Sequence, residues 1–556
     1  MSTIYNQNKY LIYIVLIILF YSYFYNLGGD LSYLKGNGDF GDEGYWLQNP
    51  ISKIKFDSFL IDDQSQSFFG APIFNYFTFL FLKYFGISFF NARLISIIFL
   101  LLTCYVLFKI LLKFDINTYS AIVISISFAL LYDNRINYQW STPIPIEIFF
   151  QSIFIYQVMF HKLINYKNIT KLIVLFILCY NSKATSVFLF PFTISIIILD
   201  NLKNFSWLKK SIYFIFPLLI FFFLRDFLFD YFYHNEYKSF KSFLLTTVSF
   251  DFKKVILNLN PYFFIISSIQ TFKFPNSTLI FTVIAFTTVK NLRQIFNLNK
   301  LKLFISNNRA LFILVFYIIF YIFYLYVINS YGYDRRQINL ILPFYLLFII
   351  LLPKVNLSKH LPLFLFFFIS LYSIQAILLF RYLQFDSETT DLKVFVYFFV
   401  FAILIISSTA IYYKSSNYLF LIFIVTNLCF HLLFNRNTET LRIANHTIAE
   451  NNYDDFVITG VNAHHLSIEN NFTPIWWLDT EIHTTYPNWN GNYLFFKKNK
   501  ITVVSSDANN NLSNGYFHHI PKDFYPLISD TVFLYPKFDN NGYLDTNFIK
   551  YYKYKK

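Results

Sequence analysis

Charged residues are scarce in this sequence. Only 14% of its 556 residues are Asp, Glu, Lys or Arg, whereas roughly a quarter of an average soluble chain is charged. Hydrophobic residues make up 56% of the chain, and 76 Phe and 45 Tyr are present. A soluble fold could not bury so much apolar surface. The composition therefore excludes an ordinary water-soluble protein and indicates a polytopic membrane protein, whose spans are apolar runs of about 17 to 25 residues.

Cysteine is also scarce. The 3 cysteines, Cys104, Cys179 and Cys429, lie in or near apolar segments, and their spacing fits neither a metal site nor a disulfide framework. The adjacent His464 and His465 have no third ligand at a recognisable spacing. The sequence also has no glycine-rich phosphate loop. Nothing in the pattern requires a metal, a nucleotide or another cofactor.

About thirteen apolar segments are long enough to be membrane spans. They are 10–27, 93–112, 117–132, 144–160, 169–181, 184–200, 211–226, 275–291, 309–329, 337–353, 361–380, 395–413 and 416–434. No small-residue cleavage site follows the first, so we expect a retained helix rather than a signal peptide. The segment "APIFNYFTFLFLKYFG" (71–86) is apolar but short, and we expect it to lie in the membrane interface.

The net charge of +14 would suggest a nucleic-acid partner in a soluble protein, but here the positive-inside rule explains it. If 71–86 does not cross, the basic residues fall in one set of short loops, with only Asp115 and Asp200 as acids nearby. They are Lys109, Lys113, Lys162, Lys167, Lys203, Lys209, Lys210, Lys290, Arg293, Lys300, Lys302, Arg309, Lys354, Lys359 and Lys414. This pattern predicts a cytoplasmic N-terminus and a first loop, 28–70, on the other face.

A change of composition after about residue 435 indicates two domains. We expect a transmembrane domain over 1–435, whose segment 28–92 is a first external loop with juxtamembrane helices. Residues 436–556 are rich in Asn, Asp, His and Tyr. Within them "DDFVITG" (454–460) and "KITVVSS" (500–506) are typical of short strands bounded by turn residues. The predicted fold is a polytopic α-helical membrane protein with a small C-terminal α/β domain outside the cytoplasm.

Ionisable residues from distant segments gather at the predicted external face. They are Asp42 and Glu43 in the first loop, Glu147 at a helix start, Lys183 at a bend between spans, Arg225 at a span end, and Arg335 and Arg336 at the start of another span. Charged groups at membrane depth are costly and often functional.

Each of these residues also has a simpler interpretation. The basic side chains could anchor the protein at lipid headgroups, and the loop acids could be merely solvated. Glu147 could favour its helix dipole. Asp133 and Arg135 could form a surface ion pair of little energetic weight, although Asp133 also competes with Glu147 as the second functional acid.

Together, the acids and bases suit transfer of a sugar from a lipid-phosphate donor. Such a reaction needs a carboxylate that takes the proton from the acceptor hydroxyl. It also needs cations that stabilise the phosphate leaving group. Apolar grooves between helices would hold the lipid tail.

Five segments follow one another along the chain: "GDEGYW" (41–46), "FFGAPIFNYFTFLFLKYFGISFFNARLIS" (68–96), "STPIPIEIFF" (141–150), "SKATSVFLFP" (182–191) and "DRRQINLILPF" (334–344). In this order they resemble motifs of the polytopic C-type (GT-C) glycosyltransferases, in the branch that contains protein O-mannosyltransferases and lipid A aminoarabinose transferases. The resemblance covers nearly the whole chain. It implies about thirteen spans and a C-terminal domain outside the cytoplasm.

The resemblance also implies roles for individual acids. Asp42 matches the acid that acts as base or orients the acceptor, with Glu43 beside it. Glu147 takes the place of the second-loop acid, which is usually Asp. A departure occurs at Ala71, before Pro72, where the aminoarabinose transferases have Lys. A different cation must meet the phosphate here, or the donor differs.

The basic residues match the phosphate-binding side of the reaction. Lys183 and Arg336 match positions expected near the lipid phosphate, and we expect Arg335 and Arg225 to assist them. The predicted activity is transfer of a sugar, with inversion, from a polyprenyl-phosphate donor such as an undecaprenyl-phosphate sugar. The acceptor would be a glycan, lipid or protein. The Lys- and Asn-rich, Ala-poor composition suggests an AT-rich bacterium, and so a periplasmic reaction at the inner membrane.

Two other functions fit the composition. A transporter or flippase of lipid-linked sugars would line its central helices with charges, whereas the charges here lie at one end of the spans. An envelope-assembly scaffold would leave the loop acids dispensable.

Overall fold

The computed structural model describes fourteen parts of the helical region and five strands. These are residues 2–24, 27, 46–47, 50–51, 53–54, 71–131, 134, 141–201, 206–233, 275–295, 308–327, 338–382, 390–413 and 416–425, and strand residues 456–459, 473–475, 502–505, 528–538 and 544–552. The chain divides into two compact units. The first comprises 1–22, 99–137 and 144–433, and the second comprises 23–98, 138–143 and 434–556.

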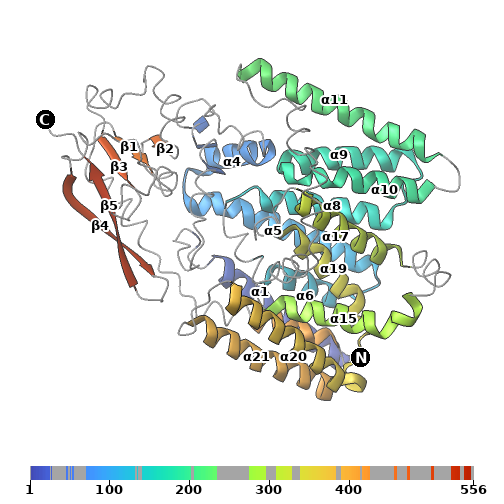
Figure 1. Cartoon of the computed structure of the whole chain (residues 1–556). Coiled ribbons are helices and arrows are strands. Elements are labelled where there is room, and N and C mark those ends of the chain that lie inside the picture. Colours follow the sequence, from blue (N-terminus) through green and yellow to red (C-terminus); the bar gives the residue numbers. More distant parts are fainter. Residues whose placement is uncertain are drawn as a thin grey trace. The chain divides into compact units, whose positions relative to one another are not determined.

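Helices dominate the described residues before 426 (Figure 1). They are α1 (Ser2–Phe24), α4 (Pro72–Phe85), α5 (Phe89–Lys113), α6 (Thr118–Ala129), α8 (Ile144–Phe160), α9 (Tyr166–Ser182), α10 (Leu189–Asn201), α11 (Trp207–Tyr233), α15 (Pro275–Ile295), α17 (Arg309–Val327), α19 (Ile341–Leu351), α20 (Leu357–Tyr382) and α21 (Thr390–Ser408). Short 3-10 helices η1 (Ala184–Phe188), η3 (Ile338–Leu340), η4 (Leu352–Lys354) and η6 (Ser416–Leu419), and a π-helix η5 (Thr409–Tyr413), adjoin them.

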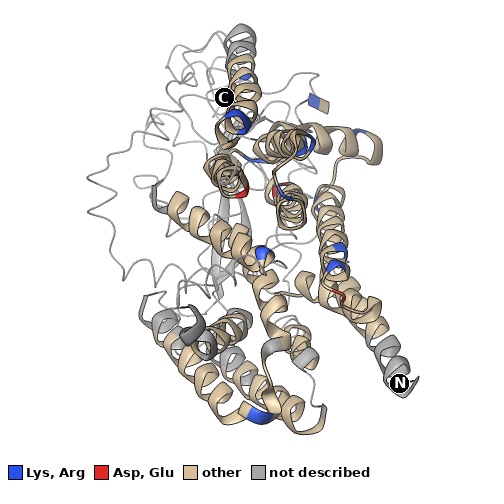
Figure 2. Cartoon of the chain, turned by 90° about the vertical axis from the view of Figure 1, so that its right-hand side faces the viewer, with Lys and Arg blue, Asp and Glu red and all other residues tan. Residues whose placement is uncertain are grey.

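Every segment predicted to span the membrane overlaps a described helix. Among the described residues, four helices are long and apolar enough to cross a bilayer: Phe89–Lys113, Ala184–Asn201, Trp207–Arg225 and Leu357–Ile374. Seven shorter apolar helices accompany them: Ile12–Phe24, Thr118–Ala129, Ile144–Phe160, Thr278–Val289, Arg309–Leu325, Ile341–Leu351 and Phe398–Tyr412. Figure 2 shows few charged residues over these helices. A helical protein with several helices able to cross a membrane is confirmed, and the number of spans and their orientation stay predictions.

Hydroxyl side chains inside the helices satisfy their hydrogen bonds locally. Thr103, Ser125, Thr193 and Thr282 each donate to the carbonyl oxygen four residues earlier, over 2.6 to 2.8 Å. An unpaired polar group costs several kcal/mol in hydrocarbon, and this back-bonding removes that cost. Scattered Ser and Thr are therefore compatible with membrane-crossing helices.

The first unit has an interior helix and a peripheral one. Nearly every residue of α19 is buried, and the hydroxyl of its Tyr345 donates to the carbonyl oxygen of Ile124 over 2.6 Å. In contrast, α11 leaves Phe216 62% and Phe223 69% exposed. A helix that is apolar on all sides belongs in a core or in lipid. We therefore assign α19 to the protein interior and the exposed face of α11 to lipid.

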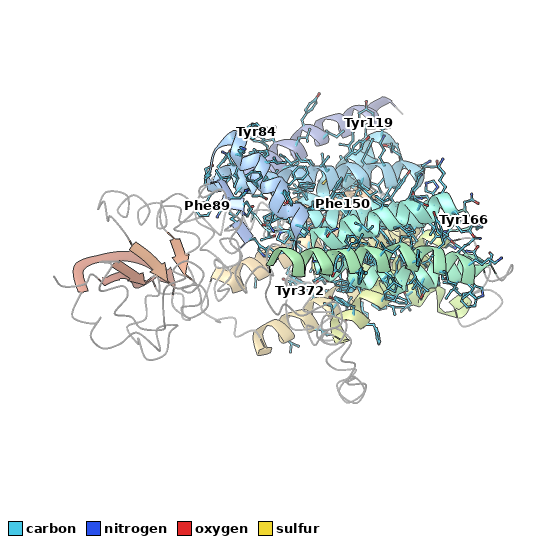
Figure 3. All side chains as sticks on the ribbon, turned by 90° about the horizontal axis from the view of Figure 1, so that it is seen from above. Tyr84, Phe89, Tyr119, Phe150, Tyr166 and Tyr372 are labelled. Atoms are coloured by element: carbon cyan, nitrogen blue, oxygen red, sulfur yellow. The ribbon has the colours of Figure 1, made fainter. Side chains whose placement is uncertain are left out.

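Helices α8 and α9 run antiparallel, joined by the short turn 161–165, and they pack against each other. In Figure 3, Tyr166 of α9 lies at one end of these helices and Phe150 of α8 lies toward the other. Helix α17 packs against both α8 and α10. This arrangement places the start of α8 and the end of α9 at one end of the bundle.

The opposite end of these helices is closed by an ion pair between Asp200 of α10 and Arg309 of α17. The second carboxylate oxygen of Asp200 accepts the backbone N–H of Leu163, in the turn between α8 and α9, over 2.7 Å. These loops belong to the set that the charge pattern places on one side of the membrane. The structure agrees with that grouping.

Residues 71–86 contain α4 (Pro72–Phe85), as a short helix was expected there. The helix begins with Pro72 after the buried Ala71, because proline suits the first turn, where the N–H has no partner. It ends at Gly86, whose φ of +91° suits glycine. One face buries Phe74 and the other exposes aromatic side chains such as Tyr84. The interfacial location of α4 stays a prediction.

The described strands form a mixed sheet in the second unit. They are β1 (Phe456–Thr459), β2 (Thr473–Ile475), β3 (Thr502–Ser505), β4 (Ile528–Phe538) and β5 (Leu544–Tyr552), in the order β2-β1-β3-β5-β4. Strand β1 pairs in parallel with β2 and β3, and β5 pairs antiparallel with β3 and β4. The strands predicted within 454–460 and 500–506 are thus confirmed. The α/β character of the tail and the boundary at 435 stay predictions.

Candidate functional site

The structure describes three of the seven predicted site residues: Glu147, Lys183 and Arg225. The other four, Asp42, Glu43, Arg335 and Arg336, lie outside the described residues, as do Asp133, Arg135, His464 and His465. Their predicted roles stay predictions.

Glu147 lies in the first turn of α8, which begins at Ile144 directly after Pro143. Pro145 fits this turn because the first N–H groups of a helix have no partner within it. The side chain of Glu147 is 0% exposed, and its neighbours Ile146 and Ile148 are buried as well. Burial of an ionised carboxylate costs several kcal/mol unless it is paired and hydrogen-bonded. The partners of this carboxyl group are therefore informative.

One oxygen of Glu147 is surrounded by donors. Its Oε1 accepts from the hydroxyl of Thr185 over 2.6 Å, from the hydroxyl of Ser186 over 2.7 Å, and from Nε2 of Gln151 over 3.1 Å. The other oxygen, Oε2, is buried and has no partner in hydrogen-bond geometry among the described residues. The side chain of Asn339, at the start of α19, lies beside the carboxyl group. The two oxygens thus have different environments.

Lys183 sets the position of the two hydroxyls. Helix α9 ends at Ser182, and Lys183 is extended, with φ −165° and ψ 131°. Its N–H donates to the carbonyl oxygen of Cys179 over 3.0 Å, and its own carbonyl oxygen accepts the N–H of Ser186 over 3.1 Å, which opens η1. The bend predicted at Lys183 is confirmed. This break turns the next two hydroxyls toward Glu147.

Lys183 also contributes charge to the site. Its ammonium group lies close enough to act electrostatically on the Glu147 carboxyl group. A cation and an acid therefore lie close together at one end of the bundle. Their roles in catalysis and phosphate binding stay predictions.

Arg225 of α11 reaches the same end of the bundle through Tyr180 of α9. Its Nη1 donates to the Tyr180 hydroxyl over 2.8 Å, and its guanidinium carbon lies 4.8 Å from the centre of the Tyr180 ring. Arginine is suited to both contacts, because its planar guanidinium group stacks on aromatic rings and donates hydrogen bonds from the N–H groups at its edge. Tyr180 is only three residues before Lys183, so Arg225 lies near that part of the chain. Its role in phosphate binding stays a prediction.

Sequence reasoning missed several residues of the site: Gln151, Thr185, Ser186, Tyr317 and Asn339. Gln151 follows Glu147 by four residues, and this spacing places two side chains on one helix face. Thr185 and Ser186 are the second and third residues after Lys183. These two signals could have been found. No sequence signal indicated Tyr317, because α17 contains several other aromatic residues and nothing in the sequence distinguishes this tyrosine from them.

In the described part of the chain, no group of three or more His, Cys, Asp or Glu side chains could hold a metal ion.

No protein-family model matches the sequence, and no curated protein matches it. Two solved structures match over nearly the full length. ArnT from Cupriavidus metallidurans bound to undecaprenyl phosphate gives a TM-score of 0.62 at 12% sequence identity, over 97% of this chain and 96% of that chain. The apo state of that protein gives 0.59 at 11% identity, over 99% and 98%. The chain thus has a fold similar to that of ArnT, a GT-C lipid A aminoarabinose transferase, which confirms at the level of the fold the resemblance predicted from its motifs.

Proposed function

We propose that this protein is an integral-membrane glycosyltransferase that uses a polyprenyl-phosphate-linked sugar as donor. The acceptor is a glycan, lipid or protein at the external, periplasmic face of a bacterial inner membrane. The fold supports the proposal, because the similar ArnT structure contains undecaprenyl phosphate. The positive-inside charge pattern supports the location.

One observation carries the proposal: a fully buried carboxyl group with one oxygen held by three donors and the other without a partner among the described residues. Lys183 lies close enough to interact with it electrostatically. Ionisable groups placed at membrane depth are expensive and mark functional sites.

The chemistry requires one displacement. A carboxylate takes the proton of the acceptor hydroxyl as the hydroxyl oxygen bonds to the anomeric carbon. The bond from that carbon to the phosphate oxygen breaks, and polyprenyl phosphate leaves with the electron pair. Lys183, with Arg335, Arg336 and Arg225, would stabilise the negative charge on the leaving group. One displacement inverts the anomeric centre. Asp42 is the proposed base, Glu43 its orienting neighbour, and Glu147 the second acid.

A transporter or flippase of lipid-linked sugars is the alternative. Such a protein needs a polar path through its bundle, yet α19 in the interior of the first unit is apolar and almost entirely buried. The described charges instead gather near helix ends, with Glu147 and Lys183 at one end and Asp200 and Arg309 at the other. This separation favours an enzyme.

The two functions release different products. The purified protein in proteoliposomes would receive a polyprenyl-phosphate sugar labelled in the sugar, together with a membrane extract that supplies acceptors. A glycosyltransferase transfers the label to a new molecule and leaves polyprenyl phosphate. A flippase moves the intact donor across the membrane and leaves the label on the lipid. Movement of label without cleavage would contradict the proposal, and a scaffold would produce neither result.

Replacement of Lys183 by Gln is expected to raise the KM for the donor about tenfold, because a charge-assisted hydrogen bond to phosphate contributes about 1.5 kcal/mol or more. Lys171→Gln is the matched control, since Lys171 is an exposed residue of α9, toward the end of that helix away from Lys183. Steady-state kinetics over a range of donor concentrations provide the measurement. Equal effects of the two variants would remove Lys183 from the donor site.

A further inference from the structure

A chain of buried side chains leads from Glu147 into the helix bundle. Gln151 lies one turn after Glu147 on α8 and donates to Oε1 of Glu147 over 3.1 Å. Its carbonyl oxygen accepts the hydroxyl of Tyr317, on α17, over 2.9 Å. Both Gln151 and Tyr317 are buried. None of these contacts is needed to form the helices themselves.

The hydrogen bonds of Gln151 fix the orientation of its amide. Its nitrogen has two hydrogens, and these are directed to Oε1 of Glu147 and to the hydroxyl oxygen of Ser186, each over 3.1 Å. Ser186 in turn donates to Glu147 over 2.7 Å. If the amide were reversed, its oxygen would face the carboxylate and repel it. Tyr317 opposes this reversal because its hydroxyl donates to the amide oxygen.

The ring of Tyr317 is itself held in place. It packs edge-on against Phe188 of η1 and Phe192 of α10, with ring centres 5.1 and 5.6 Å away. Phe188 follows Ser186 by two residues, so the same short helix supplies both a donor to Glu147 and a support for Tyr317. Fully paired polar networks in a low-dielectric interior are rigid, and their members act as a unit.

We propose that Gln151 and Tyr317 are positioning residues that, through Oε1, orient the carboxyl group of Glu147 so that Oε2 is the oxygen that binds the acceptor hydroxyl while the proposed base takes its proton. The inference rests on the proposed function and deepens it. Three donors hold Oε1, whereas Oε2 has no hydrogen bond of normal geometry among the described residues, where the Asn339 side chain lies beside the carboxyl group. The Tyr317 hydroxyl acts only through Gln151.

The kinetic test uses two single variants and their combination, each in proteoliposomes with a labelled polyprenyl-phosphate sugar. Tyr317→Phe removes one hydroxyl and is expected to lower kcat about fivefold with an unchanged KM for the donor. Gln151→Met keeps the length of the side chain, removes both polar atoms and is expected to lower kcat about thirtyfold. The double variant should be no slower than Gln151→Met, because residues of one network have non-additive effects.

Tyr345→Phe is the matched control. Tyr345 is a buried tyrosine whose hydroxyl donates to the backbone oxygen of Ile124, apart from the network around Glu147. Its loss should leave kcat per folded molecule unchanged. The inference would be wrong if Tyr317→Phe resembled this control, if the two effects multiplied in the double variant, or if KM rose while kcat stayed constant.

An infrared measurement tests the inference without any activity. The carboxyl stretching band that disappears in Glu147→Gln belongs to Glu147. Gln151→Met and Tyr317→Phe should shift this band, and Tyr345→Phe should leave it in place. A band that does not move in the first two variants overturns the inference even if the protein transfers sugar. If the band shifted in these two variants but the wild-type protein transferred no sugar, the proposed function would be refuted and the orienting network around Glu147 would still be supported.

Discussion

Replacement of Glu147 by Gln is expected to lower the rate of sugar transfer by about a hundredfold or more, because the acceptor hydroxyl loses the carboxylate that holds it for the base, and acid–base catalysis contributes about 10² to 10⁴ in rate. The substitution is conservative in shape. The amide oxygen of Gln can accept from Thr185, Ser186 and Gln151 as Oε1 does. The amide nitrogen would then occupy the position of Oε2. The variant therefore removes the carboxyl group but keeps the shape of the side chain and its contacts with the three donors.

The measurement is transfer of labelled sugar per folded molecule, with the folded fraction checked by size-exclusion chromatography in detergent. Asp42→Asn is the companion variant, because the sequence assigns the base to Asp42, and a loss of about a hundredfold is expected there as well. If Glu147→Gln kept wild-type activity and Asp42→Asn lost it, Glu147 would have a structural role only. Full activity in both variants would refute the proposed mechanism.

Replacement of Asp200 by Ala is expected to destabilise the protein by about 3–5 kcal/mol, the usual cost of removing one partner of a buried ion pair. The side chain of Asp200 is 6% exposed and that of Arg309 is 24% exposed. Arg309 donates to both carboxylate oxygens of Asp200 and, from Nη2, to the carbonyl oxygen of Val158 over 3.2 Å. The pair therefore connects α8, α10 and α17.

The neighbour of Asp200 strengthens this expectation. Asp200 accepts the N–H of Leu163 over 2.7 Å, and Asn201 donates to the carbonyl oxygen of the same residue over 2.9 Å. Lys210 of α11 donates to Asn201 over 2.5 Å. Two adjacent side chains of α10 thus hold both backbone polar groups of one turn residue. Loss of Asp200 would leave that N–H unpaired as well as the Arg309 charge.

Thermal unfolding in detergent, followed by intrinsic fluorescence, measures the effect. Asp115→Asn is the control. Asp115 is an exposed acid in a tight turn with φ +57°, a conformation that Asn also tolerates, so its replacement should change stability by less than about 0.5 kcal/mol. An Asp200→Ala variant that unfolds at the wild-type temperature would show that the pair is not essential. Arg309→Ala should behave like Asp200→Ala, because each leaves one charge unpaired.

The sequence allowed a good prediction of where the helices lie. Segments 144–160 and 184–200 were expected as spans, and α8 and the η1–α10 pair occupy them. Apolar runs bounded by polar residues determine such limits. The bend at Lys183 was also predictable, since a charged residue there interrupts two apolar runs.

The contacts across helices could not be predicted in the same way. Which face of α8 meets η1 depends on its rotation about its axis, and a helix that is apolar on nearly all sides gives no indication of that rotation. The pairing of Glu147 with Thr185 and Ser186 was therefore missed. Asp200 and Arg309 were assigned to the same side of the membrane, but their pairing depends on how α10 and α17 pack. The predicted roles of Asp42, Glu43, Arg335 and Arg336 stay predictions because the structure does not describe these residues.

Because Lys183 is extended and ends α9, the positions of the Thr185 and Ser186 hydroxyls depend on the number of residues between α9 and these two side chains. Successive residues of a 3-10 helix are about 120° apart around its axis. One inserted or deleted residue between Ser182 and Thr185 would thus shift each hydroxyl by one position around the axis, so that at most one of them could still face the carboxyl group. The paired contact on Glu147 therefore depends on the number of residues in this stretch as well as on their side chains.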